Sequence, residues 1–156
     1  MGQFYTREEL VAARAVWKRE GKIVVFTNGC YDILHPGHIR LLEKARSMGG
    51  LLILALNTDS SVRRLKGPSR PLLAEMERVE MALALEAVDA VTLFDEDTPR
   101  ELIAAVLPDI LIKGADWAHF IAGREEVEAA GGRVLALDLE PGYSTTGIVE
   151  EILARP

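Results

Sequence analysis

The sequence predicts an α/β protein with a Rossmann-like, doubly wound parallel sheet that carries helices on both faces. Short apolar runs rich in branched residues alternate with segments of helical period, and such alternation implies right-handed crossovers between parallel strands. With 156 residues, of which 49% are hydrophobic and 27% charged, the chain fits one compact domain with a substantial core. We expect a five-stranded sheet, with strands at residues 22–27, 51–57, 89–94, 109–113 and 133–138.

The first element is expected to be a helix over residues 7–19. Thr6 and Glu9 have the spacing of a capping box, in which each side chain bonds the backbone N–H of the other residue. The apolar side of this helix is expected to pack on the sheet or on a partner. Residues 1–20 are therefore predicted to form an N-terminal helical extension of a single domain, whose catalytic core would span residues 21–156.

The later helices are predicted mainly from their ends. A helix that begins near Gly37 is expected to stop at Gly49–Gly50, because paired glycines end helices. Thr98 as N-cap and Pro99 at the first helical position predict another helix. A further helix is expected over residues 118–130, and a last one follows a Ser-Thr-Thr run near the C-terminus.

Charge and hydropathy exclude several classes of protein. The formal net charge is −6, so no general attraction to nucleic acid or to an anionic membrane is expected. The strongest apolar run, residues 51–56, is far too short to span a bilayer, and the N-terminus is polar. A cytoplasmic, unprocessed protein is expected.

Cys30 is the single cysteine, so an internal disulfide is impossible. Two interpretations of it stay open, a reactive thiol and a small buried residue at a tight turn. The sequence identifies no base that would activate a thiol, which favours the structural interpretation.

The segment Thr27–His38 carries the strongest functional signal. It begins where the apolar run Lys22–Phe26 ends, and it leads into a helix, so backbone N–H groups without internal partners would meet an anion there. His35 and His38 lie three residues apart at that helix start, and both can donate hydrogen bonds to the oxygens of a transferred phosphoryl group. Glycine and proline between them leave room for a phosphate and fix the first turn.

With its H-x-G-H signature, this segment resembles the cytidylyltransferase-like nucleotidyltransferases. More narrowly, it is similar to the adenylyltransferases that make an ADP-activated glycero-manno-heptose from ATP and heptose 1-phosphate, for lipopolysaccharide or surface-glycan precursors. Similar blocks follow in the family's order over nearly the whole chain, at residues 63–67, 69–71, 85–89, 96–99, 107–116 and 144–146.

The motif position and this resemblance together assign the candidate site residues. Catalytic roles fall to His35, His38 and Lys113. Nucleotide-binding roles fall to Thr27, Asn28, Gly29, Cys30, Tyr31, Asp32, Gly37, Lys66, Arg70, Arg78, Gly114, Asp116, Ser144, Thr145 and Thr146.

Structural roles remain open for many of these residues. The histidines can cap or pack the turn, and Asp32 can fix the loop by hydrogen bonds. Lys66 and Arg70 can belong to a solvated basic loop, and Arg78 can pair with a surface glutamate. Helix capping alone accounts for the other polar residues in question, namely Asp116, Ser144, Thr145 and Thr146, while Trp117 is expected to pack.

The reaction expected from the resemblance is in-line attack of a sugar 1-phosphate on the α-phosphorus of ATP, with release of pyrophosphate. No covalent enzyme intermediate is needed, and Mg²⁺ is expected to arrive bound to ATP, with no metal site built by the protein. Alternatives are transfer from CTP to a polyol or glycerol phosphate, transfer from ATP to phosphopantetheine, and a nucleotide-binding regulatory module. The apolar sides of the first and last helices make a homodimer an expectation.

Overall fold

The computed structural model describes residues 1–156 except the side chain of Trp117, whose expected packing role lies outside the described part. Over that part the sheet has six strands, all parallel, in the order β1-β4-β3-β2-β5-β6. The strands are β1 (Gln3–Phe4), β2 (Val24–Gly29), β3 (Leu51–Asn57), β4 (Ala90–Phe94), β5 (Ile110–Gly114) and β6 (Arg133–Leu137).

The α/β class and the parallel doubly wound sheet are confirmed, with one strand more than the five expected. The additional strand, β1, pairs with β4 at one edge of the sheet and is only two residues long, which is too short to show an apolar pattern. The second strand also runs further than predicted, to Gly29, so the first residues of the functional motif belong to the strand itself.

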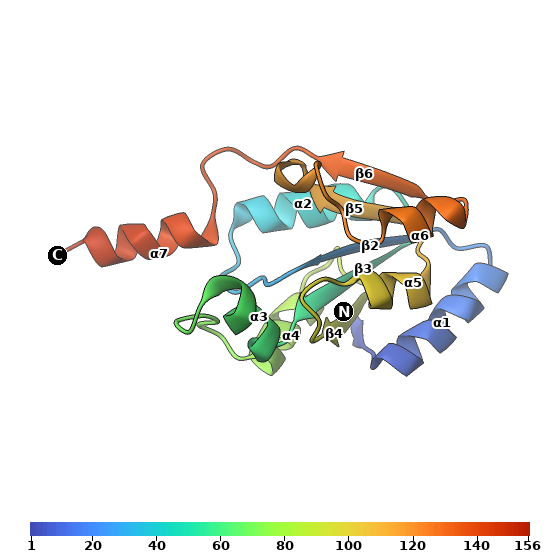
Figure 1. Cartoon of the computed structure of the whole chain (residues 1–156), viewed down its shortest axis with the longest axis horizontal. Coiled ribbons are helices and arrows are strands. Elements are labelled where there is room, and N and C mark those ends of the chain that lie inside the picture. The colour runs from blue at the N-terminus through green and yellow to red at the C-terminus, as the bar shows by residue number, and fades with distance from the viewer.

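Helices cover both faces of the sheet (Figure 1). Leu42 and Val79, from two of these helices, are buried against one face, whereas Leu10 and Leu102 are buried against the other. The helices are α1 (Arg7–Arg19), α2 (Pro36–Arg46), α3 (Asp59–Lys66), α4 (Glu75–Leu83), α5 (Arg100–Val106), α6 (Arg124–Ala129) and α7 (Thr145–Ala154), with a short 3-10 turn η1 (Ala115–Trp117).

The helix α1 has the predicted bounds and the predicted cap. The backbone N–H of Glu9 donates to Thr6 Oγ1 at 3.2 Å, and the backbone N–H of Thr6 donates to Glu9 Oε2 at 2.8 Å. Leu10 of this helix is fully buried and packs inside the molecule, whereas Val11 and Val16 are 36% and 41% exposed.

Two predicted helix starts were wrong. The helix α5 begins at Arg100 with Pro99 as its N-cap, one residue later than expected, so Thr98 makes no cap. The helix expected over residues 118–130 begins only at Arg124. The preceding residue, Gly123, has φ +87°, a left-handed conformation that a continuous right-handed helix cannot contain.

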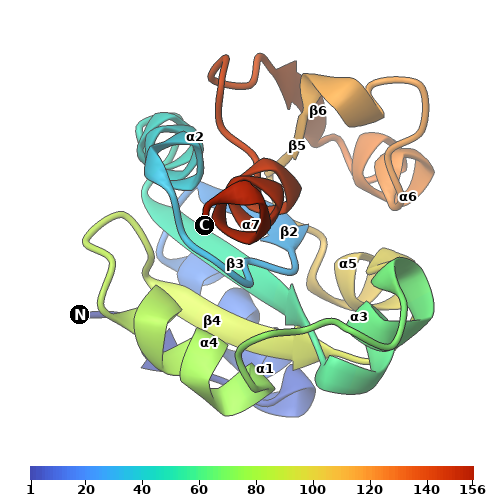
Figure 2. The ribbon, with the colours of Figure 1, turned by 90° about the vertical axis from the view of Figure 1, so that its left-hand side faces the viewer.

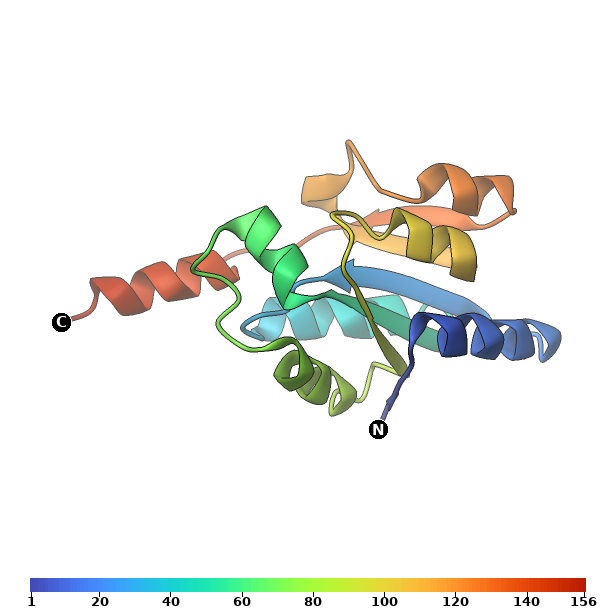
Figure 3. The ribbon, with the colours of Figure 1, turned by 60° about the horizontal axis from the view of Figure 1, so that its bottom comes forward.

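The last helix, α7, projects from the body at the edge where the strands end (Figures 1 and 2). None of its residues is buried. Figure 3 shows α3, the segment before α4 and the base of α7 at this same end of the sheet. No helix in the described part of the chain is long and apolar enough to cross a membrane.

Candidate active site

A cleft opens at the carboxyl ends of β2 and β5, which are neighbours in the sheet although β3 and β4 come between them in sequence. The chain leaves β2 toward one side of the sheet and returns to β5 on the other, so this is the switch point where α/β proteins bind ligands. The cleft has a volume of about 170 Å³ and is lined by Thr27, Asn28, Gly29, Cys30, Tyr31, Asp32, His38, Leu41, Lys66, Lys113, Gly114, Asp116, Leu139 and Thr145.

The two histidines sit at the start of α2, where His35 is the N-cap and Pro36 the first helical residue. The backbone N–H of His35 donates to His38 Nδ1 at 3.3 Å, and the two rings are stacked with centroids 3.8 Å apart. Because Nδ1 of His38 accepts a hydrogen bond, the proton of its neutral imidazole lies on Nε2. His38 is therefore a hydrogen-bond donor on the wall of the cleft.

Burial keeps both imidazoles neutral at physiological pH. It lowers the pKa of His38 to about 4, with smaller contributions from His35 and from the positive charge of Lys66. Burial also lowers the pKa of His35. An imidazole that is neutral at pH 7 stabilises a phosphoryl oxygen through an aimed N–H group, without a full positive charge.

The histidines belong to a column of four rings. Tyr31 contacts His38 with ring centroids 4.7 Å apart, and on the other side the Tyr143 ring stacks on His35 at 5.8 Å. The guanidinium of Arg40 lies over the Tyr143 ring at 5.6 Å. His35 Nδ1 is buried and has no hydrogen-bond partner among the described residues. The segment before α7 is thus coupled to the histidines by packing.

Asp32 holds the basic loop that contains Lys66 and Arg70 against the segment Thr27–His38. Its carboxylate accepts hydrogen bonds from the backbone N–H groups of Leu72, at 2.8 and 2.9 Å, and Leu73, at 2.9 Å. Arg70 forms a looser ion pair with Asp32 at 3.8 Å, and its buried Nη1 has no hydrogen-bond partner among the described residues. Asp32 therefore holds this loop in place, and Arg70 lies beside it without lining the cleft.

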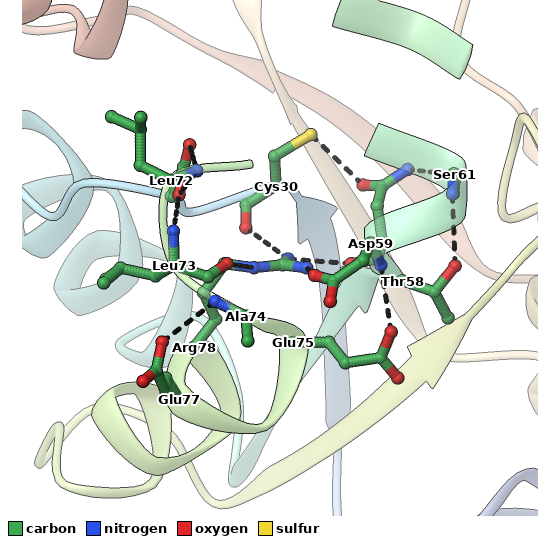
Figure 4. Close-up of polar contacts among 12 residues, drawn as sticks. Cys30, Thr58, Asp59, Ser61, Leu72, Leu73, Ala74, Glu75, Glu77 and Arg78 are labelled. Carbon is green, nitrogen blue, oxygen red and sulfur yellow. Dashed lines mark hydrogen bonds and ion pairs between the residues drawn. The ribbon is translucent and has the colours of Figure 1, made fainter. Parts of the chain in front are cut away.

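Arg78 ties three segments together beneath the cleft (Figure 4). Its fully buried guanidinium donates to the carbonyl oxygens of Leu73, Cys30 and Asn57 at 2.7 to 3.0 Å and pairs with Asp59 at 2.9 Å. The guanidinium does not line the cleft. Arg78 thus positions the ends of β2 and β3.

The lysines and Asp116 bring charge to the cleft. Lys113 Nζ donates to the backbone oxygen of Asn28 at 3.2 Å. Burial lowers the pKa of this amine, and the negative charge of Asp116 partly offsets that lowering. Lys66, the last residue of α3, reaches the cleft from the opposite side of β2. At Gly114 a Cβ atom would lie 2.8 Å from Asp116 Oδ1, so glycine allows the carboxylate to sit close to the strand end.

Cys30 has the environment of a structural residue. Its Sγ lies 3.7 Å from Asn57 Oδ1, and burial raises the pKa of the thiol, although the nearby Lys66 and Arg78 act in the opposite direction. A thiol with a raised pKa stays protonated and is a poor nucleophile.

The Ser-Thr-Thr run meets the cleft through its middle residue. Ser144 caps α7 by accepting a hydrogen bond from the backbone N–H of Gly147 at 2.9 Å. Thr145 lines the cleft and donates from Oγ1 to the backbone oxygen of Ile33 at 3.2 Å. Thr146, like Gly37, is at a helix start but does not line the cleft.

Most of the residues predicted from the sequence therefore converge on one edge of the sheet, and His35 lines an adjoining groove. Sequence reasoning missed Leu41 and Leu139, two apolar side chains of the cleft. Leu139 follows β6, the strand next to β5, so its place after a strand end was the available signal. Among the described residues, no group of three or more His, Cys, Asp or Glu side chains could hold a metal ion.

Comparison with known proteins places this geometry in a family. The model of the cytidylyltransferase-like family matches residues 26–151. A bifunctional protein HldE from Syntrophotalea carbinolica is 55% identical over 150 residues, which are 96% of this chain and 31% of that protein. A bifunctional protein HldE from Azorhizobium caulinodans is 52% identical over 149 residues, with 95% and 31% covered. The chain thus spans about a third of the length of these curated relatives.

Solved structures show the same fold. A lipopolysaccharide core biosynthesis protein from Thermoplasma volcanium aligns with a TM-score of 0.63 and 28% identity, over 77% of this chain and 98% of that chain. A pantoate-beta-alanine ligase from Francisella tularensis aligns with a TM-score of 0.65 over 100% of this chain and 80% of that chain. Its identity of 13% supports a common fold alone.

Proposed function

Because the chain belongs to the cytidylyltransferase-like family, we propose that it is an adenylyltransferase that transfers AMP from ATP to glycero-manno-heptose 1-phosphate. The products are ADP-heptose and pyrophosphate, and the pathway served is the synthesis of lipopolysaccharide or surface-glycan precursors. The observation that carries the proposal is the His38 donor in a cleft at the switch point, within a chain that is 55% identical to an HldE protein. The similar solved structure is described as a lipopolysaccharide core biosynthesis protein, which fits the same pathway.

The reaction we propose is a direct displacement. An oxygen of the anomeric phosphate forms a bond to the α-phosphorus of ATP, the bond from that phosphorus to the bridging oxygen breaks, and pyrophosphate leaves with the electron pair. The attacking phosphate is already an anion at neutral pH, so no general base is required. His38 donates from Nε2 to a non-bridging oxygen, and His35 supplies a second imidazole beside it. Lys113 and Lys66 balance the developing charge.

The nucleotide would occupy the cleft that contains His38. Its phosphates would meet the start of α2 and the side chain of Thr145, and Asp116 would accept hydrogen bonds from ribose hydroxyls. Arg70, whose Nη1 pairs with Asp32 at 3.8 Å and makes no hydrogen bond among the described residues, would bond the leaving pyrophosphate. Arg78 and Asp32 hold the surrounding loops in place.

Mg²⁺ is proposed to enter with ATP, bound to triphosphate oxygens. Asp32, an acidic residue of the cleft, already accepts three backbone hydrogen bonds and would stay on its loop when the ion arrives with ATP. The ion would neutralise charge on the phosphates.

A substrate panel tests the proposed function. Pyrophosphate release is measured with ATP or CTP against glycero-manno-heptose 1-phosphate, glycerol 3-phosphate and phosphopantetheine. We expect turnover with ATP and the heptose phosphate. Strong turnover with CTP and glycerol 3-phosphate, and none with the expected pair, would show that the substrate assignment is wrong.

Replacement of His38 by alanine tests the mechanism. Loss of one aimed donor is expected to lower kcat by about 10²- to 10³-fold. Equilibrium binding of ATP should change far less, because the donor acts mainly on the transition state. A His38→Ala variant with normal kcat would contradict the assigned role.

A homodimer is also proposed, with α7 as its contact. The apolar side chains Ile152 and Leu153 of this helix are 62% and 79% exposed. In α1, in contrast, Leu10 is buried inside the molecule, and Val11 and Val16 are less exposed, at 36% and 41%. Sedimentation equilibrium of the purified chain measures the oligomeric state directly.

A further inference from the structure

A second and larger cavity, of about 630 Å³, adjoins the cleft that contains His38. The two cavities share five residues of their walls, which therefore form the boundary between them: Asn28, Gly29, Cys30, Lys66 and Lys113. Beyond this boundary the second cavity is lined by residues that do not touch the first: Asn57, Leu65, Asp97, Thr98, Pro99, Phe120, Ile121 and Ala122.

Two adjoining cavities suit the geometry of a displacement between two substrates. In an in-line displacement the attacking oxygen and the leaving oxygen lie on opposite sides of the phosphorus. A site for such a reaction needs two compartments, with cations where the phosphates of both substrates meet. Lys66 and Lys113 stand at the boundary of the two cavities, where they can contact both substrates.

The lining of the second cavity suits a sugar. The carboxylate of Asp97 and the hydroxyl of Thr98 can bond sugar hydroxyls, since one accepts and the other both donates and accepts. Phe120, which is 57% exposed, offers an aromatic surface for the apolar face of a sugar ring. A volume of about 630 Å³ also lies in the range usual for small-molecule sites.

We propose that this second cavity binds the acceptor sugar 1-phosphate, with Asp97 and Thr98 reading its hydroxyls, Phe120 packing on its ring, and Lys66 and Lys113 holding its phosphate. The proposal rests on the proposed adenylyltransferase function. It assigns a role to the block of residues 96–99, which the nucleotide cleft leaves unused.

Asp97 is held in place for this role by Arg64. The guanidinium Nε donates to Asp97 Oδ1 at 2.9 Å, which leaves the other carboxylate oxygen for a ligand. Asp95 serves as the comparison: its carboxylate also pairs with Arg64, at 4.0 Å, and is similarly exposed, and it accepts a hydrogen bond from Thr58 Oγ1 at 2.5 Å, but it does not line the cavity. Replacing either residue removes one negative charge beside the same arginine.

The test compares the steady-state kinetics of Asp97→Ala, Phe120→Ala and Asp95→Ala, measured by pyrophosphate release from the full chain. For Asp97→Ala and Phe120→Ala we expect the KM for the heptose phosphate to rise about tenfold or more, as for a lost charged hydrogen bond or ring contact. Their KM for ATP should stay within about twofold of the wild-type value, because exposed residues outside the nucleotide cleft contribute little to ATP binding. Asp95→Ala should leave both constants near wild type. Thermal unfolding verifies that each variant is folded.

The outcomes separate the two proposals. If Asp95→Ala raises the acceptor KM as much as Asp97→Ala, or if the Asp97 and Phe120 variants raise only the KM for ATP, the cavity assignment is wrong and the adenylyltransferase function stands. If the wild type rejects heptose phosphate but uses another phosphorylated acceptor, the substrate proposal fails. The KM values of the three variants for that acceptor then still show whether the second cavity binds it. A wild type that turns over no acceptor overturns both.

Discussion

At the scale of single residues, the chemistry depends on a histidine that burial keeps neutral. The hydrogen bond from the backbone of His35 to His38 Nδ1 fixes the tautomer, and burial lowers the pKa of His38 to about 4. The sequence indicated two imidazoles near a phosphate. It could not indicate their protonation, because the desolvation arises from packing against Tyr31 and His35, which only the folded structure defines.

The neutral His38 predicts how stability depends on pH. The pKa of His38 is about 4 in the folded chain and about 6.5 when unfolded, so the unfolded state binds more protons between these values. The free energy of unfolding should therefore be highest above pH 6.5 and fall as the pH decreases toward 4. Urea unfolding across this range should show a shallower slope for His38→Gln, which cannot be protonated. An unchanged slope would mean that His38 is not desolvated in solution.

Tyr143 is predicted to position His35 through its ring alone. Tyr143→Ala removes a stacked ring and exposes His35, so the lowered pKa of His35 should return toward its ordinary value. We also expect kcat to fall about three- to tenfold, the equivalent of one aromatic pair. The histidine pKa is read by NMR titration. Tyr143→Phe keeps the ring and should behave as wild type, and a loss as large as that of the alanine variant would show that the hydroxyl matters instead.

At the scale of elements, much of the fold follows from the sequence. Apolar runs predicted the five long strands to within two residues, and the capping box of Thr6 predicted α1. The errors have local causes. The strand β1 is two residues long, and α6 is delayed because the left-handed Gly123 lies inside a stretch of helical composition. Such features depend on tertiary contacts that override local preference.

Arg78 connects segments that are far apart in the sequence, and its replacement is predicted to destabilise the fold. Arg78→Met removes a buried cation and leaves Asp59 and three carbonyl oxygens without their donor. We expect the free energy of unfolding to fall by about 3 to 5 kcal/mol. Arg64→Met is the matched control, since Arg64 is exposed and its pairs should contribute less than about 1 kcal/mol. Equal losses in urea unfolding would contradict the bracing role of Arg78.

At the scale of the whole molecule, the candidate site is a product of strand order. The motif at the end of β2 could be predicted because its residues are contiguous and stand between a strand and a helix. For Leu139 and Thr98 the sequence offers only a place after a strand end, because they follow β6 and β4 and their distance from β2 depends on how the sheet is wound. Two cavities that meet at Lys66 are visible only once β2 lies between β3 and β5.

The projecting α7 leads to a prediction about assembly and stability. Because none of its residues is buried, deletion of residues 148–156 should change the free energy of unfolding of the monomer by less than about 1 kcal/mol. If α7 joins two copies, the same deletion should convert a dimer to a monomer in sedimentation equilibrium, because Ile152 and Leu153 are the apolar surface lost. The substitutions Ile152→Glu and Leu153→Glu should have the same effect while the helix stays present. A dimer that persists in both variants would place the contact elsewhere, and a large loss of monomer stability would mean that α7 packs against the body in solution.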